Sequence, residues 1–327
     1  MLAVQFPRAT LARVAGEAMT RLSRYGPVLS LGAGVQSTTL LLLAAEGALP
    51  PLVAAVFADT GWEPKAVYDH LDRLEREVAE PAGIPIIRVQ WGNLRTDAIE
   101  GHRWLKMPVF VLSPQGKRGQ SMRQCTKDYK IDPIKRKLRE LMGAKISASG
   151  AVLSPPADTL MEQWIGISRD EFHRAKSADE KWLVNRFPLL DMNWTRQDCL
   201  TYLDERGWES TPKSACIGCP YHGNRMWRDM QNEAPEEFAD AVEFDRQLRS
   251  GEVRGGDRLR GQPYLHRDCV PLAEVDLRPA AERNGQGELF VEEGDPDGCS
   301  PWGCRGGEAD LPLPESLTVT DDDGEAA

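Results

Sequence analysis

Two cysteines in the second half of the chain have a spacing suited to metal binding. Cys216 and Cys219 enclose Ile217 and Gly218, and Pro220 follows them. Two thiolates at this spacing can hold one metal centre, because a tight turn lets backbone N–H groups bond to the sulfurs. Disulfide oxidoreductases use the same spacing, but at the start of a helix after the first strand of a small domain. We therefore predict a metal site, with unliganded thiols as the alternative.

A second segment, Ser30–Thr38, predicts an anion site. It reads SLGAGVQST, so small residues allow a tight turn, and a helical run of Leu and Ala follows. The N–H groups and the positive dipole end of such a helix favour a phosphate. The segment is neither a Walker A loop nor a Gly-x-Gly-x-x-Gly fingerprint, and a turn without a ligand is the alternative. The residues expected to contact phosphate are Ser30, Gly32, Ala33, Gly34, Gln36, Ser37 and Thr38.

Two further polar segments follow in an order that supports a nucleotide site. Asp59-Thr60-Gly61 comes after an apolar run, where a carboxylate could orient a ribose or a metal bound to phosphate. Gly166 then begins a segment that contains Glu171 and Arg174, a carboxylate and a guanidinium about one helical turn apart. A helix cap or a surface ion pair would explain each segment alone.

The elements that carry these segments alternate between strand and helix. Strands are expected at 28–31, 52–57, 84–90 and 163–167, and helices at 38–46, 65–79, 132–142 and 195–206, the last capped by Thr195. This alternation predicts an α/β fold, a Rossmann-like parallel sheet with helices on both faces, plus a cysteine-bearing C-terminal region. Ligands bind such sheets at the carboxyl ends of the strands, where the polar segments lie.

Composition divides the chain of 327 residues into four parts. Residues 1–25 have arginines between apolar positions and predict an amphipathic helix rather than a signal peptide. Residues 26–200 are expected to form the α/β domain, and 201–307 the cysteine-bearing region. Residues 308–327 are acidic and predict a disordered tail. The first 25 residues contain no apolar run long enough to span a membrane, so we expect a cytoplasmic protein with reduced thiols and no membrane partner.

The net charge of −10 argues against a surface that coats nucleic acid as a whole. One basic segment is the exception. Residues 117–139 contain nine Lys or Arg, opposed by Asp128 and Asp132 alone. A solvated helix face and a polyanion-binding patch both explain it.

These motifs together resemble the adenine nucleotide alpha hydrolase (PP-loop) superfamily, and within it the phosphoadenosine phosphosulfate reductase family, over roughly residues 25–275. The family's pyrophosphate loop Ser-Gly-Gly-x-Asp-Ser is matched by residues 32–37, with Gln36 in place of the acid. Residues 59–61 look like its Asp-Thr-Gly. Residues 166–174 are similar to its Gly-x-x-x-x-Glu-Ser-x-x-Arg, with Phe172 where Ser is usual.

The resemblance implies an ATP- and Mg²⁺-dependent enzyme that acts on the phosphate chain of an adenine nucleotide. The implied catalytic residues are Ser37, Asp59, Glu171 and Arg174, and Thr60 and Gly166 join the nucleotide-binding residues. The segment around Cys125 resembles the one that holds a cluster cysteine in sulfonucleotide reductases and in DNA or tRNA sulfur-transfer enzymes. A [4Fe-4S] cluster, with zinc as the alternative, is thus implied at Cys125, Cys216, Cys219 and Cys304, the last ligand being open between Cys304, Cys299, Cys269 and none.

Three functions are consistent with these residues. The first is an adenylylating, pyrophosphate-releasing enzyme of sulfur transfer or nucleotide modification, with a cysteine desulfurase as partner and a nucleic acid or nucleotide as substrate. The second is a sulfonucleotide reductase, which needs a redox-active thiol and thioredoxin. The third is a binding module without turnover and with a structural zinc, favoured by the loss of the loop acid at Gln36. Among other residues, His222 is expected at the surface, Cys199 in the core of a helix, and Trp62 in the core.

Overall fold

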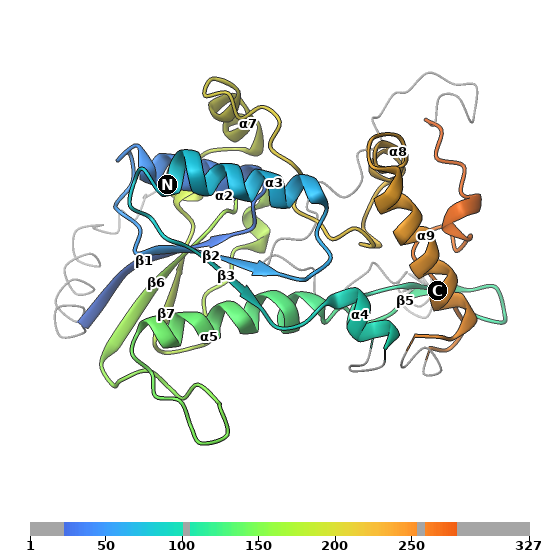
Figure 1. Cartoon of the computed structure of the whole chain (residues 1–327), viewed down its shortest axis with the longest axis horizontal. Coiled ribbons are helices and arrows are strands. Elements are labelled where there is room, and N and C mark those ends of the chain that lie inside the picture. Colours follow the sequence, from blue (N-terminus) through green and yellow to red (C-terminus); the bar gives the residue numbers. More distant parts are fainter. Residues whose placement is uncertain (1–22, 101–104, 254–258, 280–327) are drawn as a thin grey trace, which may run out of the picture.

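The computed structural model describes residues 23–100, 105–253 and 259–279. A five-stranded parallel sheet lies at the centre of its larger part, in the order β3-β2-β1-β6-β7 (Figure 1). Its strands are β1 (Ser23–Leu31), β2 (Ala54–Asp59), β3 (Ile86–Gln90), β6 (Thr159–Ile165) and β7 (Leu183–Arg186). The α/β fold class predicted from the sequence is confirmed.

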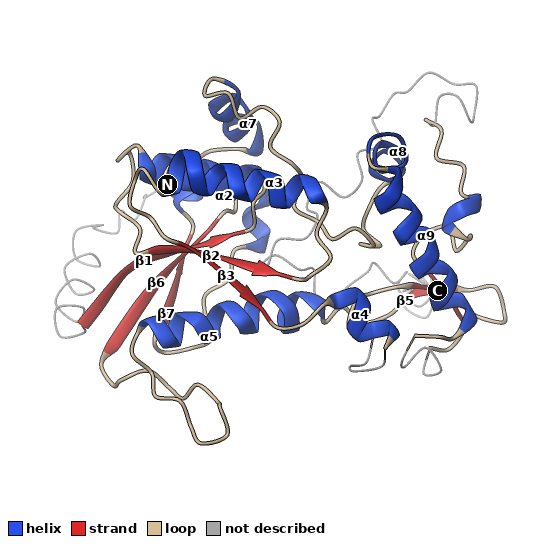
Figure 2. Ribbon diagram, in the orientation of Figure 1, coloured by secondary structure: helices blue, strands red, loops and turns tan. Residues whose placement is uncertain are grey.

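Helices cover both faces of this sheet (Figure 2). They are α2 (Val35–Ala45), α3 (Lys65–Leu74, continued by the π-helical segment Glu75–Ala79), α5 (Asp132–Leu141, preceded by the π-helical segment Lys127–Ile131), α6 (Pro188–Asp191) and α7 (Arg196–Asp204). A 3-10 helix, Arg169–Arg174, follows β6.

The alternation of side chains along the strands explains the two layers. Leu29 and Leu31 on β1 face the cluster built with α2, α3 and α7, whereas Val28 faces the cluster built with α5. Because both faces of β1 and β2 are buried, their central residues are mostly apolar, as is usual for parallel strands, with Ser30 as a buried polar exception. This burial fixes the sheet between its helices and leaves the strand ends to polar residues.

A second cluster of apolar residues surrounds the C-terminal elements. It joins α4 (Leu94–Ile99), α8 (Asn224–Glu233) and α9 (Pro235–Ser250), and its largest fully buried side chain is Trp227. An antiparallel sheet in the order β5-β4-β8 lies beside α9; its strands are β4 (Phe110–Leu112), β5 (Arg118–Gln120) and β8 (Gln262–Tyr264). A 3-10 helix, Leu272–Glu274, completes the described chain.

Asp245 fastens this C-terminal part to α9. It is fully buried, and its carboxylate accepts hydrogen bonds from the backbone N–H groups of Leu265 and Leu272 at 2.8 and 3.0 Å. Arg249 pairs with the same carboxylate at 3.1 Å. A buried charge with three donors is satisfied, so Asp245 stabilises the fold rather than offering a reactive group.

The expected elements differ from the structure mainly at their ends. Ser23, Arg24 and Tyr25, included in the predicted N-terminal helix, belong to β1, and residues 1–22 lie outside the described part. Thr195 caps α7 as predicted, accepting from Asp198 N at 3.2 Å. The predicted tail and the cysteines Cys299 and Cys304 also lie outside the described residues. Within the described ranges, no helix has the length and apolarity needed to cross a membrane.

His70 on α3 makes the stability of the domain depend on pH. Its Nε2 lies 3.0 Å from Thr38 Oγ1, and burial, together with the charge of Arg73, lowers its pKa to about 4. The ring stays neutral in the folded chain, whereas the unfolded chain binds a proton below an ordinary pKa of 6.5. The stability contributed by this group is therefore present above pH 6.5 and is lost as the pH falls towards 4.

We expect the His70→Gln variant to lose less stability than the wild-type chain between pH 7 and pH 4.5, by about 2–3 kcal/mol. Urea unfolding at the two pH values measures the difference. His173 is exposed, so His173→Gln serves as the matched control and should follow the wild-type chain. Equal pH dependence in His70→Gln and the wild-type chain would contradict the assignment.

Candidate functional site

The order of the strands places a topological switch point between β1 and β6. From β1 the chain moves to β2 and β3 on one side, and it later returns to β6 and β7 on the other. The loops that follow β1 and β6 therefore lead away from each other, which opens the usual ligand site of such sheets at their carboxyl edge. The predicted segments Ser30–Thr38 and Gly166–Arg174 meet at this point.

The glycine loop is closed by its own serine. Ser37 Oγ accepts hydrogen bonds from the N–H groups of Gly32 and Gly34 at 3.2 and 3.3 Å and donates to the Gly34 carbonyl at 3.2 Å. Helix α2 begins at Val35 with Gly34 as its N-cap. Ser37 thus shapes the loop, and the N–H groups of the first helical turn supply the positive end that favours an anion.

Ala33 adopts a backbone conformation that L residues avoid. Its φ is 55°, in the left-handed region, at the position where the resembled family has glycine. A non-glycine residue held there costs about 1–3 kcal/mol, and such strain gathers at binding sites. Ala33 is fully buried, so the surrounding packing holds the loop in this shape.

Gln36, which stands in place of the family's acid, is held by two neighbours. Its Oε1 accepts from the guanidinium of Arg196 at 3.0 Å, and its Nε2 donates to Ser168 Oγ at 3.5 Å. Arg196 is the first residue of α7, and its backbone N–H donates to Asp170 at 3.0 Å. Because an amide carries no charge, Arg196 adds a cation to the loop that Gln36 does not neutralise.

Gly166 packs directly against the glycine loop. A Cβ atom built on it would lie 2.9 Å from Ser37 N and 3.0 Å from the Gln36 carbonyl carbon. Both neighbours are backbone atoms that belong to the start of α2, so the contact leaves no room for a side chain. This close approach explains the glycine that opens the segment after β6.

The pair Glu171 and Arg174 lies in the segment that follows. The two side chains form a buried ion pair at 3.0 Å, with 6% and 3% of their surfaces exposed. They lie on one 3-10 helix, as their spacing predicted. Their contact with a nucleotide stays a prediction.

Asp59 shapes the turn after β2. Its Oδ1 accepts from Gly61 N and from the hydroxyl of Tyr68, both at 2.7 Å. Burial and this hydrogen bond to Asp59 raise the pKa of Tyr68 well above its ordinary value, so the hydroxyl keeps its proton and remains a donor at neutral pH. The role of Asp59 beside a ribose or Mg²⁺ stays a prediction.

The segment that precedes Cys216 covers the glycine loop. Cβ atoms built on Gly34 and Gly32 would lie 3.3 Å from Ser214 Cβ and 3.7 Å from Ser214 Oγ. The Pro212 carbonyl lies 3.9 Å from the same position on Gly34. The chain therefore passes over the predicted phosphate site at Ser214, two residues before Cys216.

Cys216 itself meets the turn after β2. Its Sγ lies 3.3 Å from Thr60 Oγ1 and 3.6 Å from Glu63 Oε1. Thr60 donates to Glu63 Oε1 at 3.0 Å, and the Cys216 thiol donates to the same oxygen. Lys130, from the basic segment, pairs with the same Glu63 oxygen at 3.0 Å, and both side chains are at least 95% buried.

This buried network of Thr60, Glu63, Lys130 and Cys216 joins three distant parts of the chain. Glu63 Oε2 is buried and has no hydrogen-bond partner within the described residues. Breaking one side of a buried ion pair costs about 3–5 kcal/mol, so the network holds the thiol in a fixed place.

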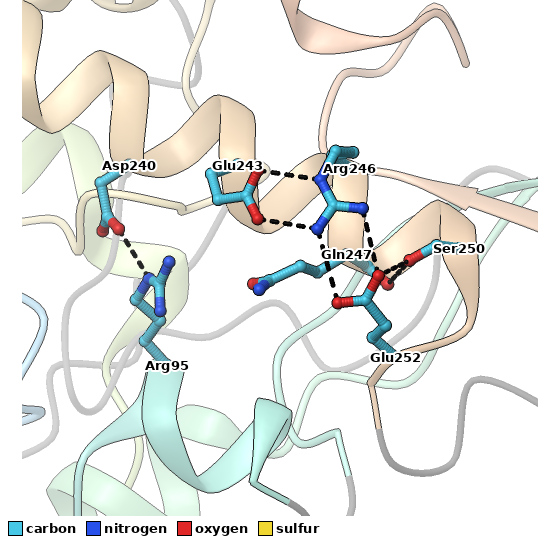
Figure 3. Close-up of polar contacts among 7 residues, drawn as sticks. All are labelled: Arg95, Asp240, Glu243, Arg246, Gln247, Ser250 and Glu252. Atoms are coloured by element: carbon cyan, nitrogen blue, oxygen red, sulfur yellow. Dashed lines mark hydrogen bonds and ion pairs between the residues drawn. The ribbon is translucent and has the colours of Figure 1, made fainter.

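Trp62 holds in place the loop of residues 216–219, called the thiol loop below. Its carbonyl accepts from Ile217 N at 2.9 Å, and a Cβ atom on Gly218 would lie 2.0 Å from its ring. The indole N–H donates to Asp240 of α9 at 2.7 Å, and Arg95 of α4 pairs with the other oxygen of Asp240 (Figure 3). Trp62 lies in the core, as predicted, and Gly218 is the residue that lets the loop approach it.

The neighbouring residues of α9 form an exposed ionic group. Arg246 bridges Glu243 at 2.8 Å and Glu252 at 3.1 Å, and Ser250 donates to Glu252 at 2.7 Å (Figure 3). Exposed pairs of this kind contribute little stability, so we assign them no part in the site.

The prediction of a surface position for His222 is wrong. The side chain is 4% exposed, and its Nε2 lies 2.9 and 3.2 Å from the carbonyls of Cys216 and Ile217. Because both partners are acceptors, Nε2 carries the proton. The ring packs against Trp227 with 4.6 Å between centroids. His222 therefore stabilises the thiol loop through its two carbonyls.

Five cysteines fall within the described residues and all are buried: Cys125, Cys199, Cys216, Cys219 and Cys269. Cys125 and Cys216 belong to the same apolar cluster. Cys199 lies in the other core, where burial raises its pKa to about 12, as expected of an inert thiol. Burial also raises the pKa of Cys269.

These thiols do not amount to a finished metal site. Within the described ranges, no three His, Cys, Asp or Glu side chains form a group that could hold a metal ion. Cys304 lies outside those ranges. The cluster implied by the resemblance stays a prediction, and we derive no chemical step through it.

Several of these residues escaped the sequence interpretation: Ser168, Arg196, Ser214 and Lys130. Each reaches the site from a distant segment, Arg196 across 160 positions from Gln36. Arginine and serine are common on any surface, so their types carry no signal. Only Lys130 had one, its place in the basic segment beside Cys125.

Comparison with known proteins gives one family. Residues 26–212, more than half of the chain, match the phosphoadenosine phosphosulfate reductase domain. No curated protein matches the sequence. A crystal structure of phosphoadenylyl-sulfate (PAPS) reductase from Candida auris, in a phosphate complex, is similar with a TM-score of 0.34 and 13% identity, over 65% of this chain and 92% of that one. By its matching domain, the chain belongs to the phosphoadenosine phosphosulfate reductase domain family.

Proposed function

We propose that this chain is an enzyme that binds ATP with Mg²⁺ at Gly32–Thr38 and uses it to activate a substrate for sulfur transfer. One observation carries the proposal. The segment from Pro212 to Cys219 touches both the glycine loop, through Ser214, and the turn after β2, through Cys216. The thiols thus lie at the same edge of the sheet as the anion site.

The proposed reaction has two steps. An oxygen of the substrate attacks the α-phosphorus of ATP. The bond between this phosphorus and the oxygen that leads to the β-phosphate breaks, and pyrophosphate leaves with the electron pair of that bond. N–H groups at the start of α2 and the Arg196 guanidinium would stabilise the negative charge. In the second step the outer sulfur of a persulfide attacks the activated carbon and AMP leaves. A second thiol then attacks the inner persulfide sulfur, so that the S–S bond breaks, the thiolated substrate is released and a disulfide forms, which an external thiol reduces. A cysteine desulfurase is the proposed source of that sulfur.

A second candidate is a sulfonucleotide reductase, favoured by the family of the matching domain. There a thiolate attacks the sulfur of the sulfonucleotide and the nucleotide leaves. A second thiol then releases sulfite and a disulfide forms, which thioredoxin reduces. The two candidates consume different nucleotides and release different products.

Product analysis separates them. We expect the chain to form AMP and pyrophosphate in equal amounts from ATP when a persulfide donor and a mixed nucleic acid are present. Sulfite released from phosphoadenosine phosphosulfate and thioredoxin, without cleavage of ATP, would establish the reductase instead. Tight ATP binding without products from either nucleotide would favour a binding module. Ser37→Ala, which removes the side chain that closes the loop, should reduce turnover about a hundredfold.

The metal is tested separately from turnover. We expect protein purified without oxygen to contain a [4Fe-4S] cluster that absorbs near 400 nm, roughly where thiolate–iron charge transfer falls. Cys216→Ser should lower the iron content, whereas Cys199→Ser, in the other core, should keep it. A colourless protein with stoichiometric zinc would contradict the iron–sulfur prediction.

A further inference from the structure

A groove of about 920 Å³ runs along the outer side of α5, away from the glycine loop. Helix α5 covers the lower face of the sheet in Figure 1 and forms one wall of the groove. The residues of α5 that line it are Asp132, Lys135, Arg136 and Arg139, which share one face of the helix at spacings of three and four. The function proposed above does not use this face.

Two tryptophans enter the groove from different strands. Trp91 follows the end of β3 and is 44% exposed, and Trp182 precedes the start of β7. An indole ring that is partly in solvent offers a large flat apolar face on which a planar group can stack. Trp182 also packs partly against the core beside α5, so its ring is held in place.

The cationic side chains of the groove differ in whether a carboxylate pairs with them. Lys135 pairs with Glu180 at 2.6 Å, and Lys106 pairs with Asp128 at 3.1 Å. Arg139 is different, because its buried Nε has no hydrogen-bond partner within the described residues. This Nε is out of reach of solvent, so a phosphate in the groove would pair with the terminal nitrogens of the same guanidinium.

We propose that this groove binds single-stranded nucleic acid, with bases stacked on Trp91 and Trp182 and a phosphate on Arg139. Exposed aromatic rings beside cations are the usual means of binding single strands, because every base has a face on which a ring can stack. The net charge of the chain is −10, so the attraction must come from this groove and not from the surface as a whole.

The groove also leads to the thiol site. The π-helical segment Lys127–Ile131 runs directly into α5. Asp128 and Asp132 line the groove, while Lys130, between them, turns inward to Glu63 beside Cys216. A strand in the groove therefore passes within about one helical turn of the thiol network. That this strand is the molecule to be modified rests on the proposed function; that the groove binds it does not.

Fluorescence anisotropy of the full chain with labelled oligonucleotides, single-stranded DNA or RNA of mixed sequence, tests the proposal. We expect Trp91→Ala to weaken binding on the order of tenfold and Trp91→Phe to keep most of it, because phenylalanine still stacks. Arg139→Gln should lower the slope of log affinity against log salt by about 0.7, the share of one phosphate contact on a single strand. Arg76→Gln, an exposed arginine beyond α3, is the matched control and should change neither quantity.

Three further binding measurements test the proposed groove. A duplex of the same sequence should bind at least about tenfold more weakly, since its bases are not open to stacking. Ser37→Ala should leave oligonucleotide binding intact and Trp91→Ala should leave ATP binding intact, so failure here is distinct from failure of the nucleotide site. Absence of binding, equal affinity for free AMP, or binding unchanged in both Trp91→Ala and Arg139→Gln would overturn the proposal.

Discussion

Replacing Gly166 with alanine should abolish nucleotide binding in a chain that still folds. The added methyl group would lie 2.9 Å from Ser37 N and 3.0 Å from the Gln36 carbonyl carbon. Contacts under about 3 Å force a shift, and here both partners are backbone at the start of α2. The loop that Ser37 closes must then open or move. The N–H groups of the first helical turn then no longer point together at the phosphates, so the binding that they provide is lost.

Calorimetric titration with ATP and circular dichroism measure the two parts of this prediction. Gly119→Ala is the matched control, because a Cβ atom there meets nothing within 4 Å. We expect Gly119→Ala to bind ATP like the wild-type chain. If Gly166→Ala bound ATP with unchanged affinity, the loop would not be the phosphate site.

Replacing Gly218 with alanine should have the opposite effect to Gly166→Ala. We expect this variant to keep ATP binding and to lose the thiol chemistry. Its Cβ would lie 2.0 Å from the ring of Trp62. That ring cannot move freely, because Asp240 holds its N–H at 2.7 Å and Ile217 holds its carbonyl at 2.9 Å. The thiol loop must therefore leave its seat, at a cost of about 1–3 kcal/mol for overpacking.

Thiol reactivity reports this displacement directly. Cys216 and Cys219 are 5% and 8% exposed, so an aromatic disulfide reagent should react with them slowly in the metal-free wild-type chain and rapidly in Gly218→Ala. The double variant Trp62→Leu/Gly218→Ala removes the ring that the methyl group meets and should recover part of the lost stability. Equal reactivity of wild-type and Gly218→Ala thiols would show that the loop is not seated on Trp62.

Local sequence signals predicted the fold class, which the structure confirms, and they place the candidate site where the strands end. Mainly apolar runs at Val28 and Leu52, each followed by a helix, identified buried parallel strands, because burial on both faces favours apolar residues at successive positions. The small residues of Ser30–Thr38 and the turn at Asp59 then fell at strand ends. Each of these signals spans fewer than about ten residues and depends on backbone geometry that the residue types dictate.

The partners of those segments could not be predicted in the same way. Ser214 over Gly34, Arg196 on Gln36 and Lys130 on Glu63 are contacts between segments brought together by the packing of α5, α7 and the thiol loop. His222 was misplaced for the same reason, because its two acceptors are carbonyls that only the folded loop presents. A polar residue type alone does not tell a satisfied buried group from an exposed one.

A crystal structure of the chain with a non-hydrolysable ATP analogue and Mg²⁺ tests the central claim most directly. We predict phosphate density against the backbone N–H groups of residues 33–38, beside Ser214 and Arg196, with Cys216 as the nearer thiol of its pair. An analogue bound anywhere else, or a glycine loop left empty at saturating analogue, would contradict the account.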